Sequence, residues 1–245
     1  MNRGATESRL ALHFNIFRVV QIAGAVLLGL LFSASPALGQ VCATPGKDGP
    51  AGTLSGVINT YYPGTASVGP GAMSIPVGTS AGAVTPIASG DLLLVIQMQD
   101  AGINSSNTDS YGDGVGGAPA SGSTSLNNSG RFEYVVATGA AGGTVPVRGA
   151  GGGGLLNSYT NANATATQGQ RRYQVVRIPQ YSSATLGSSL TAAPWNGTTG
   201  GILAFDVAGN LNLGAASVSV SGLGFRGGGT RQLAGGAGGA NTDYV

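Results

Sequence analysis

The sequence lacks most of the side chains on which enzymes usually depend. Its only histidine, His13, lies near the start, and its only cysteine is Cys42. A chain without histidine after residue 39 cannot form a Ser-His-Asp triad, a Cys-His pair or a histidine-based zinc or iron site. A lone cysteine cannot form a disulfide within its own chain. Catalysis would therefore have to depend on carboxylates, Tyr, Lys or Arg.

Charged side chains are also scarce. The chain has 11 Lys and Arg and 9 Asp and Glu; three of the basic residues and one acid lie before residue 40, which leaves eight of each sign. Binding of nucleic acid requires a cluster of Lys and Arg that faces the phosphates. The only tight cluster consists of Arg171, Arg172 and Arg177, and Lys47 is the single lysine. The sequence therefore predicts no nucleic-acid partner.

The segment before Gln40 has the parts of a secretion signal. The basic segment Met1–Arg18 precedes the uncharged apolar run Val19–Phe32, which is shorter than the roughly 20 residues that cross a bilayer as a helix. Pro36 then breaks the helix, and Ala37 and Gly39 are spaced like the small residues of a cleavage site. We predict a signal helix removed after Gly39, export to the cell surface or the medium, and no membrane span in the mature chain.

Glycine is abundant in the mature chain, which contains 41 of the 45 glycines. This content is typical of tight turns and closely stacked backbones. Alternating apolar residues predict strands at Leu54–Tyr62, Asp91–Gln99, Arg131–Thr138 and Arg171–Ile178. Between them lie loops rich in Gly, Ser, Asn and Thr. Because no useful stretch after the leader has a sustained apolar period of 3.6, the predicted fold class is all-β.

Two of these strands allow a more detailed prediction. In Asp91–Gln99 both faces are largely apolar, which is typical of a central, buried strand. In Arg131–Thr138 the alternation places Phe132, Tyr134 and Val136 on one face and Glu133 on the other.

The C-terminal part repeats short apolar pairs at short, regular intervals: Phe205 and Val207, Leu211 and Leu213, and Val218 and Val220. Gly209-Asn210 by itself would indicate a two-residue hairpin, whereas short strands at short intervals suit the rungs of a β-solenoid. The expected architecture is an irregular β-sandwich or a β-solenoid with long loops. The predicted organisation is a signal peptide (1–39), a linker (40–53), a β-rich domain (54–200) and the start of an incomplete glycine-rich β-repeat (201–245).

Several motifs occur together in a fixed order: GDLLLVIQMQDAGIN followed by YGDG, then VVRIPQY, PWNGTTGGILAFDVAGNL and GLGFRGG. With them the chain, over roughly residues 54–245, resembles the N-terminal region of large glycine-rich exported or cell-surface proteins of bacteria. The resemblance carries over no catalytic residue. It implies that such a protein continues well past a GFRGG-like segment.

The loop at 100–114 is rich in oxygen-bearing side chains: Asp100, Asn104, Asn107, Asp109 and Asp113. Calcium takes six to eight oxygen ligands, and extracellular calcium is plentiful enough for weak sites. The spacing is not that of an EF-hand, because Tyr111 and Ala120 stand where ligands are required. The loop is either a weak calcium site or a set of turns formed by Asn, Asp and Gly.

Aromatic residues offer a second candidate site, since a flat apolar ring with a polar edge can stack on a sugar. The candidates are Tyr61, Tyr62, Tyr111, Tyr181 and Trp195; packing in the core is the alternative for each. Residues 222–227 match G-x-G-x-x-G, but the segment after them is a poor helix former. A dinucleotide site needs that helix, so we predict no organic cofactor.

The preferred hypothesis is a non-enzymatic, exported structural module of a larger cell-surface or extracellular protein. One alternative is an adhesin-like module that binds glycans or calcium. Another is a β-solenoid enzyme that acts on polysaccharides through carboxylates. We also expect residues beyond about Gly222 to be poorly ordered in an isolated chain, because stacked β-repeats bury apolar edges only against neighbours.

Overall fold

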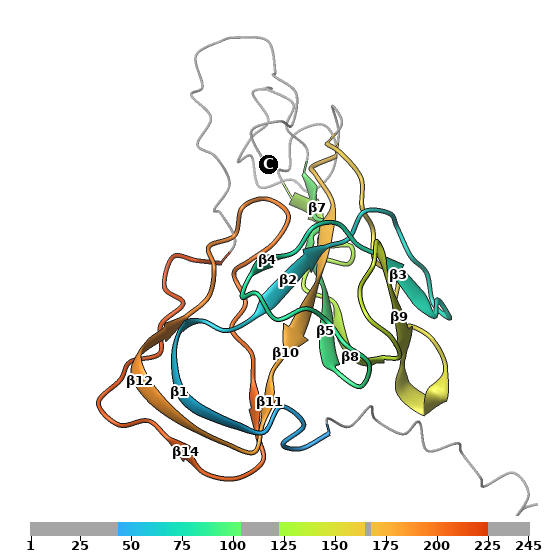
Figure 1. Ribbon diagram of the computed structural model, residues 1–245. Coiled ribbons are helices and arrows are strands. Elements are labelled where there is room, and N and C mark those ends of the chain that lie inside the picture. The colour runs from blue at the N-terminus through green and yellow to red at the C-terminus, as the bar shows by residue number, and fades with distance from the viewer. Residues whose placement is uncertain (1–43, 104–122, 165–167, 225–245) are drawn as a thin grey trace, which may run out of the picture. The chain divides into compact units, whose positions relative to one another are not determined.

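The computed structural model describes residues 44–103, 123–164 and 168–224 (Figure 1). The described chain is all-β, as the sequence predicts, with one short 3-10 turn, η1 (Ala150–Gly152). Two sheets dominate it, an antiparallel sheet of seven strands and a parallel sheet of three. The signal helix lies outside the described residues, and so does the segment beyond about Gly222 for which we expect poor order, apart from residues 223 and 224.

The seven-stranded sheet is antiparallel throughout. Its spatial order is β3 (Ser74–Pro76), β9 (Thr144–Arg148), β8 (Phe132–Ala137), β5 (Leu92–Gln99), β10 (Arg172–Ile178), β2 (Thr60–Pro63) and β4 (Ala81–Gly82). The central position of β5 confirms the prediction for Asp91–Gln99. Leu93 and Val95 contribute to one hydrophobic cluster, and Leu92 and Leu94 to another on the opposite face.

The smaller elements complete the sheets. The parallel sheet has the order β1 (Pro50–Val57), β12 (Ser183–Thr191) and β14 (Leu211–Asn212). Two further pairs are β11 (Gln180–Tyr181) with β13 (Asp206–Val207), and β6 (Gly102–Ile103) with β7 (Ser123–Ser125). In Figure 1, β1, β12 and β14 lie side by side as curved ribbons, away from the seven-stranded sheet.

The main core packs on one face of the seven-stranded sheet. Its residues come from six of the seven strands and from the connecting segments: Tyr62, Ile75, Val77, Ile87, Leu93, Val95, Val135, Ala137, Val145, Val147, Leu155, Tyr159, Tyr173 and Val175. The opposite face packs against Ala193, Ile202 and Ala204. A third cluster packs against the parallel sheet, where Leu54 and Leu186 contact Phe205. Burial on both faces of the sheet explains why the central strand β5 is almost continuously apolar.

The predicted strand Leu54–Tyr62 is in fact two strands that belong to different sheets. The chain leaves the parallel sheet after Val57 and enters the antiparallel sheet at Thr60. Between them the Asn59 side chain donates to the carbonyls of Arg177 and Ala204 and accepts from the Ala204 amide. Those bonds replace the ladder at the junction. Ordered β structure also begins at Pro50, inside the predicted linker.

Other buried carboxamides join segments in the same way. Gln174, fully buried, donates to the carbonyl of Gly200 at 2.8 Å and accepts from its amide at 2.9 Å. Gln97 donates to the carbonyl of Thr160 and accepts from the amide of the same residue. A carboxamide offers both a donor and an acceptor, as a peptide group does. It can therefore satisfy the backbone of a loop that passes over a sheet.

The β8 strand alternates as predicted, but the buried face is the one that carries the charge. Glu133 is buried beside Val135 and Ala137, whereas Phe132 and Tyr134 are exposed. The Glu133 carboxylate is tolerated because it accepts two backbone hydrogen bonds, from Leu156 at 2.8 Å and Asn157 at 2.9 Å. Hydrogen bonding compensates the cost of burying a polar group.

Candidate functional site

The predicted calcium loop is described only at its first residue. Asp100 is buried, and its Oδ2 atom accepts a hydrogen bond from the Asn128 amide at 3.1 Å. Its backbone carbonyl accepts another from Asn127, and its amide donates to the Ser129 hydroxyl. Asp100 therefore holds the turn before β8. Asn104, Asn107, Asp109 and Asp113 lie outside the described residues. Over 44–103, 123–164 and 168–224, no group of three or more Asp, Glu, His or Cys is placed to hold a metal.

Three of the aromatic residues predicted to stack on sugars belong to the interior. Tyr61, Tyr62 and Trp195 are buried. The Tyr61 hydroxyl donates to the carbonyl of Ile202 at 2.6 Å, and burial raises the pKa of this hydroxyl. A buried ring has no face for a ligand, so for these three residues core packing holds and sugar stacking is excluded. Tyr181 is half-buried against the parallel sheet, and Tyr111 lies outside the described residues.

Two other aromatic residues are open to solvent. Phe132 is 53% exposed and Tyr134 is 40% exposed. Their rings form an edge-to-face pair with centroids 5.9 Å apart and planes inclined at 78°. They project from the same face of β8, opposite Ile96 and Leu94 of β5. The sequence predicts both rings on one face of a strand but does not identify them as a site. Glu133, which stands between them, lies on the opposite face and accepts hydrogen bonds from the Leu156 and Asn157 amides.

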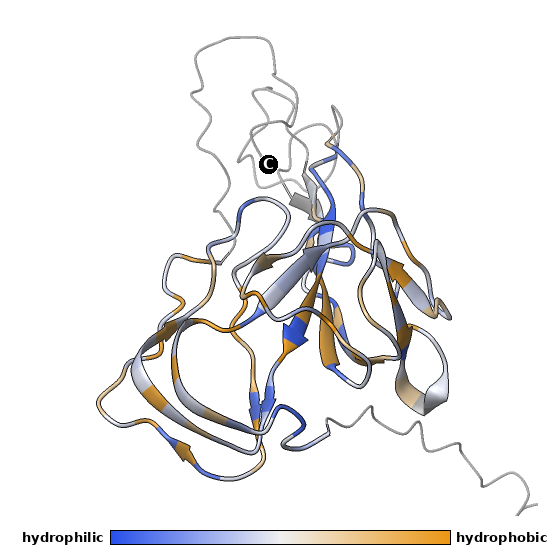
Figure 2. Cartoon of the chain, viewed as in Figure 1, coloured by the Kyte–Doolittle hydropathy of each residue, from blue (hydrophilic) through white to orange (hydrophobic). Residues whose placement is uncertain are grey.

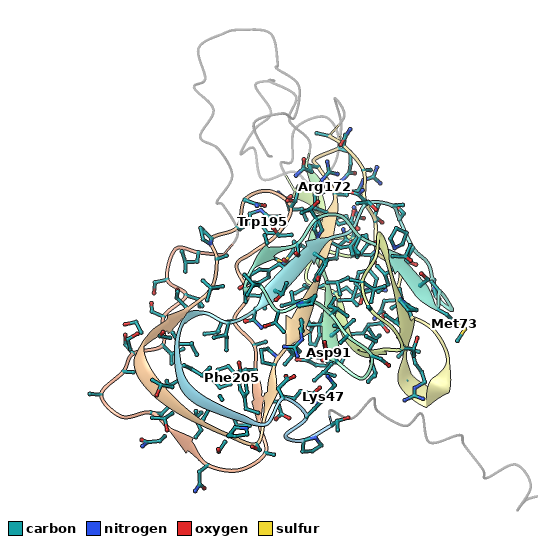
Figure 3. All side chains as sticks on the ribbon, in the orientation of Figure 1. Lys47, Met73, Asp91, Arg172, Trp195 and Phe205 are labelled. Atoms are coloured by element: carbon teal, nitrogen blue, oxygen red, sulfur yellow. The ribbon has the colours of Figure 1, made fainter. Side chains whose placement is uncertain are left out.

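Four charged side chains form a network at one end of β5 and β10. Arg177 donates to both oxygens of Asp91, at 2.8 and 3.2 Å, and to Asp48 at 2.6 Å. Lys47 donates to the Asp91 Oδ1 atom at 2.6 Å. Figure 3 shows Lys47 beside Asp91, and Figure 2 shows this end of β10 as a hydrophilic zone. No local sequence pattern indicates this network, because the hydrogen-bonded partners are 44 to 129 residues apart in the chain.

The electrostatics of the network indicate a structural role. Burial opposes the charged form of Asp91, but hydrogen bonds from Arg177, Lys47 and the Ala88 amide outweigh it, so the pKa of Asp91 lies below its ordinary value. Burial acts against the charge on Arg177 as well, and its bonds to Asp91 and Asp48 keep its pKa raised. A carboxylate held in the ionised form by two cations is a poor proton donor. The network instead fastens the Lys47–Asp48 segment to the sheet.

A second distinctive feature is the parallel pairing of residues 180–195 with residues 206–223, in which the partners have a nearly constant separation in sequence. Side-chain hydrogen bonds join Ser189 to Ser217 and Thr191 to Ser219, and each of them spans 28 residues. Among the described residues β13 and β14 pair with earlier strands and not with each other. The C-terminal pairs therefore lie along one rung, which stacks in parallel on residues 180–195, and they do not form a hairpin. Backbone partners follow the same register: Gln180 with Asp206, Ala184 with Leu211, Leu190 with Val218, and Trp195 with Leu223.

The outermost rung leaves apolar side chains in solvent. Its exposed residues are Leu211, Leu213, Val218 and Val220, each 40 to 53% exposed. Leu211 and Val218 stand opposite Ala184 and Leu190, which are buried inside the coil. The stacked apolar side chains inside the coil therefore continue into the last rung. Among the described residues none covers Leu211 and Val218 at its outer edge.

The opposite edge of the parallel sheet is different. Along β1, Gly52 and Gly56 have φ of +63° and +66°, and the register with β12 shifts at two points. A positive φ is a conformation that favours glycine. Bulges of this kind twist an edge away from further pairing. The described sheet thus has one blunted edge, at β1, and one open apolar edge, at β14.

Comparison with known proteins places the chain in no family. No family model and no curated protein matches it. Among solved structures it is similar to the Gp54 tailspike of Acinetobacter baumannii bacteriophage AP22, solved in complex with A. baumannii capsular saccharide, at 14% sequence identity and a TM-score of 0.29. The match covers 58% of this chain and 19% of the tailspike chain. A TM-score this low does not establish a common fold or function. In the described part of the chain, no helix has the length and apolar character needed to span a membrane.

Proposed function

We propose that this protein is a non-enzymatic, exported structural module of a larger surface-associated assembly. In this assembly further rungs of a parallel β-coil stack on the open edge at β14. The observation that carries the proposal is the open rung, in which the inward-facing columns of the coil end at exposed Leu211 and Val218. A β-coil buries its apolar interior only against its neighbours. The blunted β1 edge marks the side on which stacking stops.

The stacking is tested by supplying the next rung within the same chain. In the engineered chain residues 196–223 are repeated directly after Leu223, in place of the native residues 224–245. Because Leu223 is in register with Trp195, the repeated rung should lie on the native one. We expect hydrogen exchange at residues 211–220 to slow by about tenfold or more, since buried and paired amides exchange only after local opening.

The control for this experiment is an insert of the same length and composition in scrambled order. Without the apolar alternation it cannot place side chains over the open columns, so exchange at 211–220 should stay fast. Equal protection in both chains would mean that added length alone orders the edge. No protection in either chain would contradict stacking on β14.

Export is proposed on the leader alone. The apolar run Val19–Phe32 is too short to remain as a spanning helix, and Pro36–Gly39 follows it in the manner of a cleavage site. We expect the protein recovered from the outside of an expressing bacterium to begin at or near Gln40. N-terminal sequencing of the exported protein checks this; an intact Met1 would contradict removal of the leader.

A second candidate function is saccharide binding, which is favoured by the exposed ring pair Phe132 and Tyr134. These rings occupy a rigid strand between two neighbours, and they are solvent-exposed although large aromatic side chains gain free energy from burial. The enzymatic alternative would use two acids roughly 5–10 Å apart. Asp48 and Asp91 lie close enough to share Arg177 as a partner, but each is engaged in an ion pair with it. Acids held in this way are poorly suited to proton transfer, and we therefore prefer a non-enzymatic role. Release of reducing ends from a polysaccharide panel would overturn that preference.

A further inference from the structure

The ring pair on β8 belongs to a sheet face that is covered over β5 and β10 but open at β8. On the same face, Leu92 and Leu94 of β5 and Val176 of β10 are buried under the segment that carries Ala193, Ile202 and Ala204. This cover ends before β8, where both rings are substantially exposed. The edge-to-face geometry fixes the rings relative to each other, so the surface is formed before a ligand arrives.

The size of this surface selects the kind of partner. Two half-exposed aromatic side chains present on the order of 200 Å², given that each buries about 150–250 Å² when fully covered. A stable protein–protein interface needs about 800 Å² from each partner. The rings are therefore too small a surface for a protein, but they suffice for the apolar face of a short oligosaccharide.

A positively charged side chain beside the rings favours a ligand that carries negative charge. Arg148 is exposed and stands directly opposite Val136, on the face that carries the rings. Val136 is two residues beyond Tyr134, or about 7 Å along the strand. The three ion pairs found in the described residues involve other cations. The nearest acid in the strand, Glu133, points to the opposite face and is occupied by backbone amides.

We propose that Phe132, Tyr134 and Arg148 form a binding site for an acidic saccharide, in which the rings stack on sugar rings and the guanidinium pairs with a carboxylate. The inference rests on the second candidate function and is independent of stacking at β14. A planar guanidinium can bind a carboxylate through two parallel hydrogen bonds. The row from Phe132 to Val136 spans about 13 Å, which limits the bound segment to a short oligosaccharide.

The experiment titrates trigalacturonate and the neutral galactotriose into the exported protein by calorimetry at low salt. We expect trigalacturonate to bind with a Kd of about 1 mM or tighter, as is reasonable for a small solvent-exposed site, and galactotriose to bind at least about fivefold more weakly. Phe132→Ala combined with Tyr134→Ala should abolish both. Arg148→Gln should remove only the preference for the acidic ligand.

Leu126→Ala is the matched control, since Leu126 is also an exposed apolar residue; it should leave both affinities unchanged. Equal affinity for the two ligands in the parent protein would overturn the acidic inference and leave saccharide binding intact. Absence of binding to either ligand would overturn both. Binding that survives loss of the two rings would show that the site lies elsewhere. All variants change exposed side chains, and circular dichroism would verify that they fold.

Discussion

Replacing Leu94 by aspartate is expected to prevent folding. Leu94 is 6% exposed at the centre of β5, between Tyr134 of β8 and Val176 of β10. The substitution loses about 2 kcal/mol of apolar burial. It also places a carboxylate without a partner among Tyr61, Val176 and Ile178, which costs several kcal/mol more. Together these terms approach the whole stability of a typical domain, about 5–15 kcal/mol.

The measurement is soluble yield together with resistance to thermolysin. Val84→Asp is the matched control, because it introduces the same charge at a residue that is 97% exposed. We expect the control to match the parent and Leu94→Asp to be insoluble or digested within the time that leaves the parent intact. If the Leu94 variant resists protease as well as the control does, β5 is not the core strand described above.

Removal of the Arg177 side chain has the second largest expected effect. Arg177→Met keeps the aliphatic volume but leaves Asp91 with only Lys47 and the Ala88 amide, and Asp48 without its cation. Breaking a buried ion pair from one side typically costs about 3–5 kcal/mol. The segment at Lys47–Asp48 should also exchange its amides faster, because the bond between Arg177 and Asp48 holds it against β10.

Acidification should distinguish the parent protein from this variant. The folded pKa of Asp91 lies below its ordinary value of 3.8. A group whose pKa is lowered by folding stabilises the protein above its unfolded pKa, and this contribution is lost as the pH falls from about 3.8 through the folded pKa. Without Arg177 the pKa of Asp91 rises, so the free energy of unfolding should fall less steeply in this range than it does in the parent.

Urea unfolding at several pH values from neutral to acid measures both effects. Arg148→Met serves as the control, since it removes an exposed guanidinium and should change stability by no more than about 0.5 kcal/mol. Identical pH dependence in the parent and Arg177→Met would show that Asp91 does not depend on Arg177. A loss no larger than that of the control would mean that the network contributes little to stability.

The sequence by itself determined the fold class and the main strands. Side chains alternate along a strand with period two whatever the strand pairs with, so Asp91–Gln99 and Arg171–Ile178 could be recognised from local pattern alone. Because this pattern depends only on neighbouring residues, it cannot predict where a strand passes from one sheet to another. Leu54–Tyr62 has one continuous pattern but spans two sheets, because its division depends on Asn59 bonding to Arg177 and Ala204, which are far away in the sequence.

Only the tertiary structure decided which surfaces are available. Period two separates the two faces of β8 but does not say which is buried; the amides of Leu156 and Asn157 decide that, by satisfying Glu133 and leaving Phe132 outside. The apolar pairs near the C-terminus are equally compatible with a hairpin and with a coil. Parallel pairing at a nearly constant sequence separation makes them one rung of a coil, because strand partners are chosen by contacts that no local pattern contains.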